Sequence, residues 1–292
     1  MSRADALLQP HLQHTRSAAA QVPVTLFVQD TTTLDFSQME QAHGYGPIGN
    51  HAGNGLFAHN LLALTPSGQV FGLAAQLCWA RVAGVTHKHT ETRTQRYARA
   101  NKESEVWPKV LEAVGRVPQG CRWIGIGDRG SDSFDYWSRA VSLGWQCLSR
   151  IFTNRRTAHN GHLLTQARAL PVQGRLQLHQ RARPGQAART LHLNLAWREV
   201  QVLPTRNVPA LAGFPPLAAS VVRCWDARND VEWLLLATWP INNFDDAAQC
   251  VLWYEQRWSI EIDQSCCLRK SQCHARERDR SARSLASSAS SA

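Results

Sequence analysis

Apolar residues occur in short runs and alternating segments over the first half of the chain, a pattern typical of β-strands. Five strands are predicted, at 24–29, 57–64, 70–79, 123–127 and 146–150. Two segments with helical spacing interrupt them, at 103–114 and 133–141. The predicted order is therefore three strands, helix, strand, helix, strand. This order predicts an α/β fold with a mixed sheet, and it is the order expected of a ribonuclease H-like domain, whose sheet brings acidic residues together at one edge.

A region rich in Pro, Arg and Gln separates this part from a last apolar segment. Within it, Arg175–His179 and Leu191–Leu195 alternate with a period of two, as strands do. We interpret it as a β-rich insertion before the last helix of the fold. The expected organisation is a short N-terminal remnant, a ribonuclease H-like core, the insertion with a connecting strand, the final core helix and a disordered tail, at 1–22, 23–154, 155–240, 241–270 and 271–292. Residues 1–22 are expected to hold at most one short helix, from Ala4 to Leu12.

The last apolar segment carries three polar residues at helical spacing. Tyr254, Arg257 and Glu261 are three and four residues apart, so a helix would place them on one face, opposite an apolar face that includes Leu252. A guanidinium grips phosphate oxygens in pairs, a hydroxyl adds a donor, and a carboxylate can hold a cation. The trio therefore indicates a phosphate site. The alternative is a stripe of surface ion pairs.

Two more carboxylates follow strand-like runs. Asp30 comes after Val24–Gln29, and Asp128 comes after Trp123–Gly127, so both are expected at strand ends. An acid in this position is often a turn former or a helix cap. Three acids on two strands and a helix form a more specific set, since chemistry with a metal pair needs oxygen ligands that converge from rigid elements.

These residues resemble the DDE transposases of bacterial insertion sequences, in the cut-and-paste group with a tyrosine-arginine-glutamate-lysine signature. Gln29–Thr32 is similar to the first-aspartate motif and Asp128–Arg129 to the second. The remaining matches, in chain order, are Gly46–Gly49, Asn101–Ser104 with Trp107, Trp233–Leu236, and Tyr254–Glu261. The matches are ordered and run from Val24 to Glu261, so together they are far more specific than any one of them.

The resemblance implies a ribonuclease H-like fold and a mechanism. Asp30, Asp128 and Glu261 would hold two Mg²⁺ ions, which Mn²⁺ could replace, for DNA strand cleavage and strand transfer. By the same resemblance, Tyr254 and Arg257 contact phosphate near the cleaved end. Two further site residues follow from it: Trp233 stacks on a flipped base, and Arg150 lines that position. For Trp233, packing in the core beside Leu234–Leu236 is the alternative.

The overall charge agrees with a polyanionic partner. The chain of 292 residues has a net charge of +10 and a pI near 9.6, which suits DNA, both transposon ends and target. Eight scattered cysteines and no apolar signal segment indicate reduced thiols in a bacterial cytoplasm. No stretch is long enough to span a membrane. The Cys266–Cys267 and Cys273–His274 pairs do not match a common zinc spacing, and His87–His89 is interpreted as a solvated loop.

Three departures from the family pattern qualify the expected activity. The signature lysine is expected at Leu268, and Arg269 would replace it only in part. The segment before Asp30 is shorter than in the family, and the likeness to the family stops soon after Ile262. These differences indicate truncation at both ends, and the second also indicates a change of reading frame. Two functions remain open: an active catalytic core, or a non-catalytic remnant that binds DNA or inhibits a full-length transposase. The chain is expected to form homodimers or mixed oligomers with such a transposase.

Overall fold

The computed structural model describes residues 3–38, 44–49, 53–82, 103–180, 187–206, 211 and 213–260, with side chains from Leu7 onward. Ten strands form one sheet in the order β2-β3-β1-β5-β6-β10-β9-β8-β7, with β4 on β3. Strands β1, β5 and β6 are parallel, and the other pairs are antiparallel. The prediction of an α/β fold with a mixed sheet is confirmed. The strands are β1 (Val24–Asp35), β2 (Gly46–Ile48), β3 (Gly53–Leu64), β4 (Val70–Trp79), β5 (Arg122–Gly127), β6 (Gln146–Arg150), β7 (Gly174–Gln180), β8 (Arg189–Val202), β9 (Leu217–Asp226) and β10 (Val231–Ala237).

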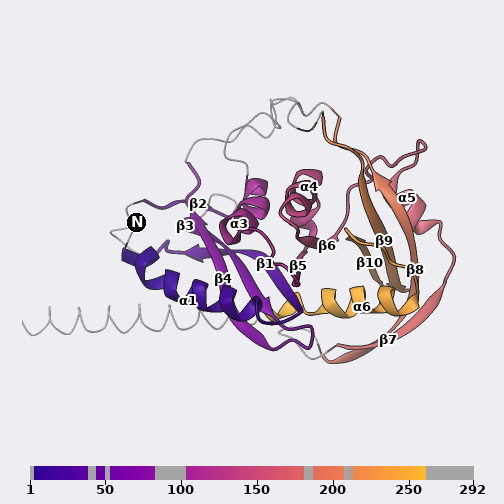
Figure 1. Ribbon diagram of the computed structural model, residues 1–292, viewed down its shortest axis with the longest axis horizontal. Coiled ribbons are helices and arrows are strands. Elements are labelled where there is room, and N and C mark those ends of the chain that lie inside the picture. Colours follow the sequence, from indigo (N-terminus) through magenta and orange to yellow (C-terminus); the bar gives the residue numbers. More distant parts are fainter. Residues whose placement is uncertain are drawn as a thin grey trace, which may run out of the picture.

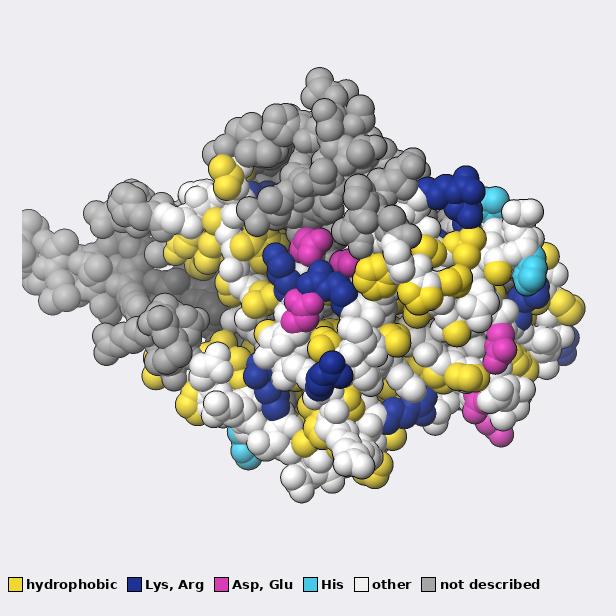
Figure 2. All heavy atoms as spheres, turned by 45° about the horizontal axis from the view of Figure 1, so that its top comes forward, with side chains coloured by type: hydrophobic (Ala, Val, Ile, Leu, Met, Phe, Trp, Pro, Cys, Tyr) yellow, Lys and Arg dark blue, Asp and Glu magenta, His cyan; other side chains and the backbone are white. Residues whose placement is uncertain are grey.

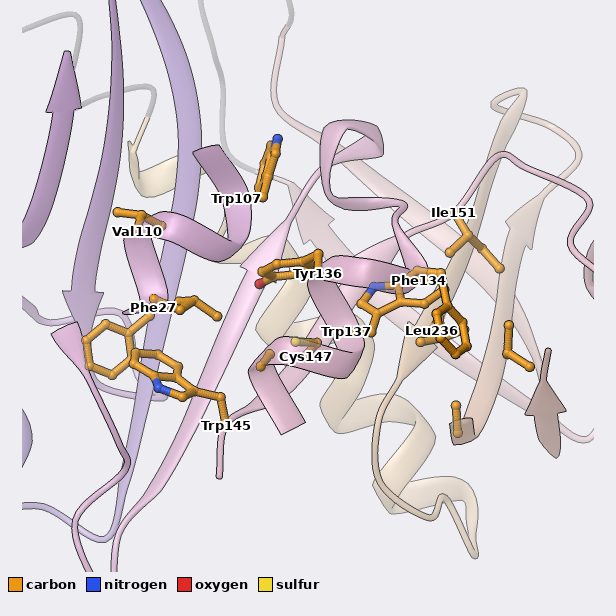
Figure 3. Close-up of a cluster of buried hydrophobic side chains, with 14 of the residues drawn as sticks. Phe27, Trp107, Val110, Phe134, Tyr136, Trp137, Trp145, Cys147, Ile151 and Leu236 are labelled. Atoms are coloured by element: carbon orange, nitrogen blue, oxygen red, sulfur yellow. The ribbon is translucent and has the colours of Figure 1, made fainter. Parts of the chain in front are cut away.

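Helices cover both faces of the sheet (Figure 1). Helices α3 (Val106–Val114) and α4 (Phe134–Ser142) lie on one face, and α6 (Phe244–Glu255) lies on the other. Two apolar cores result. The first, on the α3 and α4 face, is rich in aromatic rings, among them Phe27, Trp107 and Trp145 (Figure 3). The second, on the α6 face, is mainly aliphatic, with Leu26 and Val28 from β1.

The N-terminal helix is longer than predicted. Helix α1 runs from Arg3 to Ala19, not from Ala4 to Leu12, and it passes through Pro10. Its second half packs on β4, where Leu12, Thr15 and Ala19 are buried. This tertiary burial outweighs the weak helical pattern that the sequence shows there.

The β-rich region belongs to the same sheet as the expected core. Strand β10 pairs with β6, and β9, β8 and β7 follow in order, with the short helix α5 (Leu163–Arg168) between β6 and β7. The strands predicted at 175–179 and 191–195 lie inside β7 and β8. The domain boundaries given above stay a prediction.

Helix α6 differs from the predicted helix in its end and its faces. The helix begins after the N-cap Asn243 and ends at Glu255, and residues 256–257 form a turn. Leu252, expected on the apolar face, is 45% exposed, whereas Tyr254 is 2% exposed. The helix thus turns Tyr254 toward the sheet, because Val251 and Tyr254, three residues apart, both pack into the second core.

Candidate functional site

Three predicted site residues lie at one level on the three parallel strands. Val28 pairs with Ile126, and two residues further along both strands are Asp30 and Asp128. Gly127 pairs with Ser149, and the next residues are Asp128 and Arg150. Neighbouring strands are about 4.8 Å apart, so this register sets the three residues side by side across the sheet. We call Asp30, Asp128 and Arg150 the polar row.

All three side chains of the polar row are on the α6 face. Side chains alternate along a strand, and Asp30 shares the face of Val28, which is in the second core. By the same alternation Asp128 shares the face of Ile126, and Arg150 that of Leu148, both also in the second core. Unlike those apolar residues, the three members of the row are only half-buried. The row therefore stands where the second core reaches solvent.

The position of Asp30 along its strand differs from the prediction. Strand β1 does not end there but continues to Asp35, because the partner β3 pairs with it as far as Gly55. Asp30 is at the level where the parallel strand β5 ends, so the two carboxylates are level with each other although Asp30 is not at the end of its own strand.

Backbone amides orient both carboxylates. Thr31 N donates to Asp30 Oδ1 at 2.9 Å, and Gly130 N donates to Asp128 Oδ1 at 2.7 Å. The second bond caps the short 3-10 helix η2 (Arg129–Ser131), so Asp128 is also a helix cap, as the sequence left open. One oxygen of each carboxylate is thereby fixed in direction.

The sequence analysis did not identify the amides that extend the polar row. Asn60 on β3 pairs with Asp30, and Gln76 Nε2 on β4 donates to Asn60 Oδ1 at 2.7 Å. Asn60 is buried. The sequence feature that could have pointed to Asn60 is the polar pair His59–Asn60 inside the otherwise apolar segment Leu56–Leu64.

Tyr254 joins the polar row from α6. Burial raises the pKa of its hydroxyl, the positive charges of Arg257 and Arg150 act in the opposite direction, and the negative charge of Asp128 adds to the rise. Arg150 donates from Nη2 to Glu232 O at 3.2 Å. Residues from two strands and a helix therefore share one electrostatic environment.

Trp233 and Arg257 are buried next to this group. Trp233 is 6% exposed, and its ring meets that of Tyr254 at an angle of 62° with centroids 5.4 Å apart. The guanidinium of Arg257 lies 4.1 Å from the ring centroid of Trp258. Trp233 thus occupies the core position that was the alternative interpretation, and its stacking role stays a prediction.

The exposed aromatic ring near the polar row is Phe152. It follows Arg150 by two residues and is 58% exposed. Its backbone is fixed, because Phe152 N and Thr153 N donate to Asp132 Oδ2 at 3.0 and 2.7 Å, and Asp132 is ion-paired with Arg155 at 2.9 Å. Phe152 was not among the residues selected from the sequence.

The third expected metal ligand, Glu261, lies outside the described residues, as do Cys266, Cys267, Cys273, His274 and His87–His89. Leu268, Arg269 and Lys270 lie outside them too. Within the described ranges, no group of three or more His, Cys, Asp or Glu side chains could hold a metal ion. Of the three expected metal ligands, the structure therefore describes Asp30 and Asp128.

The surface charge is dispersed on the face drawn in Figure 2. Lys and Arg side chains are spread over it, and near its centre they stand beside Asp and Glu side chains. Among the described residues, Arg139 is ion-paired with Glu105, Glu112 and Asp135. None of the described helices is long and apolar enough to cross a membrane.

Comparisons with known proteins give a remote likeness among solved structures. No family model and no curated protein matches the sequence. Among solved structures, a piggyBac transposase in a synaptic complex with hairpin DNA is similar, with a TM-score of 0.39 and 10% sequence identity. The match covers 87% of this chain and 43% of that chain. At this TM-score the functional interpretation has to rest on the residues of the site.

Proposed function

We propose that the chain is the ribonuclease H-like catalytic core of a DDE transposase, which cleaves DNA strands and joins them to a target with the help of divalent cations. The topology supports this: four consecutive strands, one of them the three-residue β2, are followed by helix, strand, helix, strand, and the parallel strands β1, β5 and β6 lie side by side. The family is inferred from the resemblance of the sequence motifs named above.

The observation that carries the proposal is the polar row. Two carboxylates and a guanidinium stand level on three adjacent strands, on one face and half-exposed, although the chain regions that bring them are far apart in sequence. This combination suits phosphoryl transfer, because cations held by carboxylates and an arginine together neutralise the charge on a reacting phosphate.

The donor set fits a hard cation such as Mg²⁺ or Mn²⁺. Asp30 and Asp128 offer acceptor-only oxygens from rigid neighbouring strands, each oriented by a backbone amide. Glu261, one residue beyond the described Ile260, would be the third ligand. Two bound cations would supply an activated water or 3′-hydroxyl and stabilise the leaving oxygen.

The remaining residues bind the DNA. Arg150 is half-exposed and charged, so it would grip a phosphate oxygen beside the carboxylates. Tyr254 keeps its proton, because burial raises its pKa, and it therefore acts as a hydrogen-bond donor or acceptor without charge. Arg257 would add positive charge behind them. Partners are the transposon ends, target DNA and a second transposase chain.

The test is metal-dependent cleavage of DNA that carries the terminal repeats flanking the gene. The purified chain and its Glu261→Ala variant are compared at equal concentration with Mg²⁺, with Mn²⁺ and with EDTA. Cleavage that needs the metal and Glu261 supports the catalytic core. Salt-sensitive binding without cleavage by either protein supports the second function, a non-catalytic remnant.

A further inference from the structure

A chain of hydrogen bonds runs through the first core directly behind Asp30. Gln29 and Thr31, the neighbours of Asp30 on β1, point to the α3 and α4 face, because side chains alternate along the strand. Gln29 Nε2 donates to the Tyr136 hydroxyl at 2.7 Å, and its Oε1 lies 3.2 Å from His59 Nε2. His59 Nδ1 lies 2.8 Å from Thr31 Oγ1.

The direction of each hydrogen bond follows from the donors available. The Gln29 oxygen can only accept, so His59 Nε2 carries the proton and donates to it. Burial lowers the pKa of His59 to about 3, so the ring is neutral and its Nδ1 is an acceptor. The Thr31 hydroxyl therefore donates to His59 Nδ1. When the His59 ring is uncharged, each of these hydrogen bonds therefore joins a donor to an acceptor.

Thr31 links this buried chain to the carboxylate. Its hydroxyl is held by His59 on one face of the sheet, while its amide donates to Asp30 Oδ1 at 2.9 Å. At the far end, Tyr136 belongs to α4, the helix that follows the Asp128 loop. The chain therefore connects the strand that carries Asp30 to the element that comes after Asp128.

The surrounding packing leaves this chain little freedom. Gln29, His59 and Tyr136 are fully buried, and the His59 ring meets Trp107 edge-on with centroids 4.8 Å apart. A Cβ on Gly125 of β5 would come within 2.6 Å of the Tyr136 hydroxyl, so glycine makes room for it. Figure 3 shows Tyr136 between Trp107 and Cys147 on this face.

We propose that Thr31, anchored through its hydroxyl by His59 and Gln29, is a positioning residue that fixes the Asp30 carboxylate for cation binding. This inference rests on the proposed function, because the orientation of Asp30 affects activity only if Asp30 binds a cation. Without the hydroxyl anchor, Thr31 keeps its amide and its strand pairing but loses the side-chain contact that helps to hold that amide in place. Groups that orient a metal ligand from behind typically contribute about 10-fold to 100-fold in metal affinity.

The test measures Mn²⁺ binding to the full chain by titration calorimetry, which does not require catalysis. Thr31→Val removes the hydroxyl and keeps the branched shape, Thr31→Ser restores a hydroxyl, and Asp30→Asn removes the ligand. Thr25→Val is the matched control: Thr25 is buried on the same strand, and its hydroxyl donates to Ala19 O at 3.0 Å, away from the site. Urea unfolding of each variant at the temperature of the titration verifies that all of them are folded there.

The expected result is Mn²⁺ affinity about 10-fold weaker in Thr31→Val, close to that of the original chain in Thr31→Ser, and unchanged in Thr25→Val. Equal affinity in Thr31→Val and the original chain, or an equal loss in Thr25→Val, overturns the positioning role. Mn²⁺ binding that is absent, or that survives in Asp30→Asn, instead overturns the proposed metal site itself. If Thr31→Val does not fold, Thr31→Ala removes the same hydroxyl without adding a methyl group and decides the question.

Discussion

Asp30 and Asp128 are level with each other on adjacent parallel strands and present their carboxylates on the same face of the sheet. Two like charges at the spacing of neighbouring strands, about 4.8 Å, repel each other unless a cation lies between them. Both groups keep this arrangement through backbone donors, Thr31 N and Gly130 N. A pair of this kind is expected to bind a divalent cation more strongly than either carboxylate alone.

Replacing either carboxylate by its amide is expected to stop cleavage without loss of DNA binding. Asp30→Asn and Asp128→Asn keep the shape of the side chain and remove the charge that holds a cation. The rate of metal-dependent cleavage should fall by about 1,000-fold or more, which corresponds to about 4 kcal/mol of transition-state stabilisation. DNA affinity should stay equal or rise, because a negative charge is lost. Gel-based cleavage and fluorescence anisotropy measure the two quantities.

Asp245→Asn is the control for these variants. Asp245 is exposed in the first turn of α6 and has the same charge change. Its cleavage rate should match that of the original chain. Residual cleavage by both Asp30→Asn and Asp128→Asn would show that another site is responsible.

The strands were predictable because their signal is local, whereas the site depends on pairing between distant segments. The period of two located β4 and β6 at their observed limits, Val70–Trp79 and Gln146–Arg150. It did not predict that β1 continues to Asp35, since that extension comes from hydrogen bonds to β3. Nor did it give the register that aligns Asp30 with Asp128, which hydrogen bonds between strands distant in sequence define.

Burial was the other property that the sequence did not settle. Tyr254 and Trp233 were selected as DNA contacts, and both are packed against each other in the second core. Asn60 was not selected, because a single amide in an apolar segment can also be an irregularity in the pattern of a strand. Phe152 escaped notice because exposure of a ring depends on where the chain turns after β6.

Arg150 is expected to contribute one phosphate contact. In Arg150→Gln, affinity for duplex DNA should fall, and the slope of log affinity against log salt concentration should become shallower by about one. Arg198→Gln on β8 has the same change of charge at an exposed position and serves as the control. Equal slopes for Arg150→Gln and the original chain would remove Arg150 from the phosphate site.

Gly127 is expected to tolerate no side chain. A Cβ there would lie 2.5 Å from Ser131 Cβ and 2.6 Å from the Trp107 ring. Gly127→Ala should therefore lower the free energy of unfolding by about 1–3 kcal/mol and displace Asp128, the next residue. Urea unfolding and the cleavage rate should both report the change. Gly213→Ala, where a Cβ would meet no atom within 4 Å, should leave both unaltered.

The exposed ring of Phe152 is expected to contact unpaired bases. Stacking on an aromatic ring contributes about 1–3 kcal/mol per base, and it requires a base that is free of its duplex partner. Phe152→Ala should thus weaken binding to DNA with a single-stranded end by about 5-fold to 150-fold and leave binding to blunt duplex nearly unchanged. Phe214→Ala, at another partly exposed phenylalanine, is the control. An equal loss for both DNA forms would contradict stacking.

His59 is expected to make the fold sensitive to acid. Burial lowers the pKa of His59 from 6.5 to about 3, so below pH 6.5 the unfolded chain takes up a proton that the folded chain does not. The unfolded state therefore gains stability as the pH falls from 6.5 toward 3, and the contribution of His59 to folding is fully present only above pH 6.5. Between pH 7.5 and pH 5 this single group should lower the free energy of unfolding by about 2 kcal/mol.

Urea unfolding at these two pH values measures the effect, and His59→Gln isolates it. Glutamine does not titrate, so in this variant the free energy of unfolding should differ less between the two pH values, by the amount that His59 contributes. The variant should be less stable than the original chain at both pH values. His179→Gln is the control, because His179 is exposed on β7. If His59→Gln and the original chain lost equal stability on acidification, the ring would also be protonated in the folded state at pH 5, and the hydrogen bond between Thr31 and His59 would have to reverse, with Nδ1 donating to the Thr31 hydroxyl.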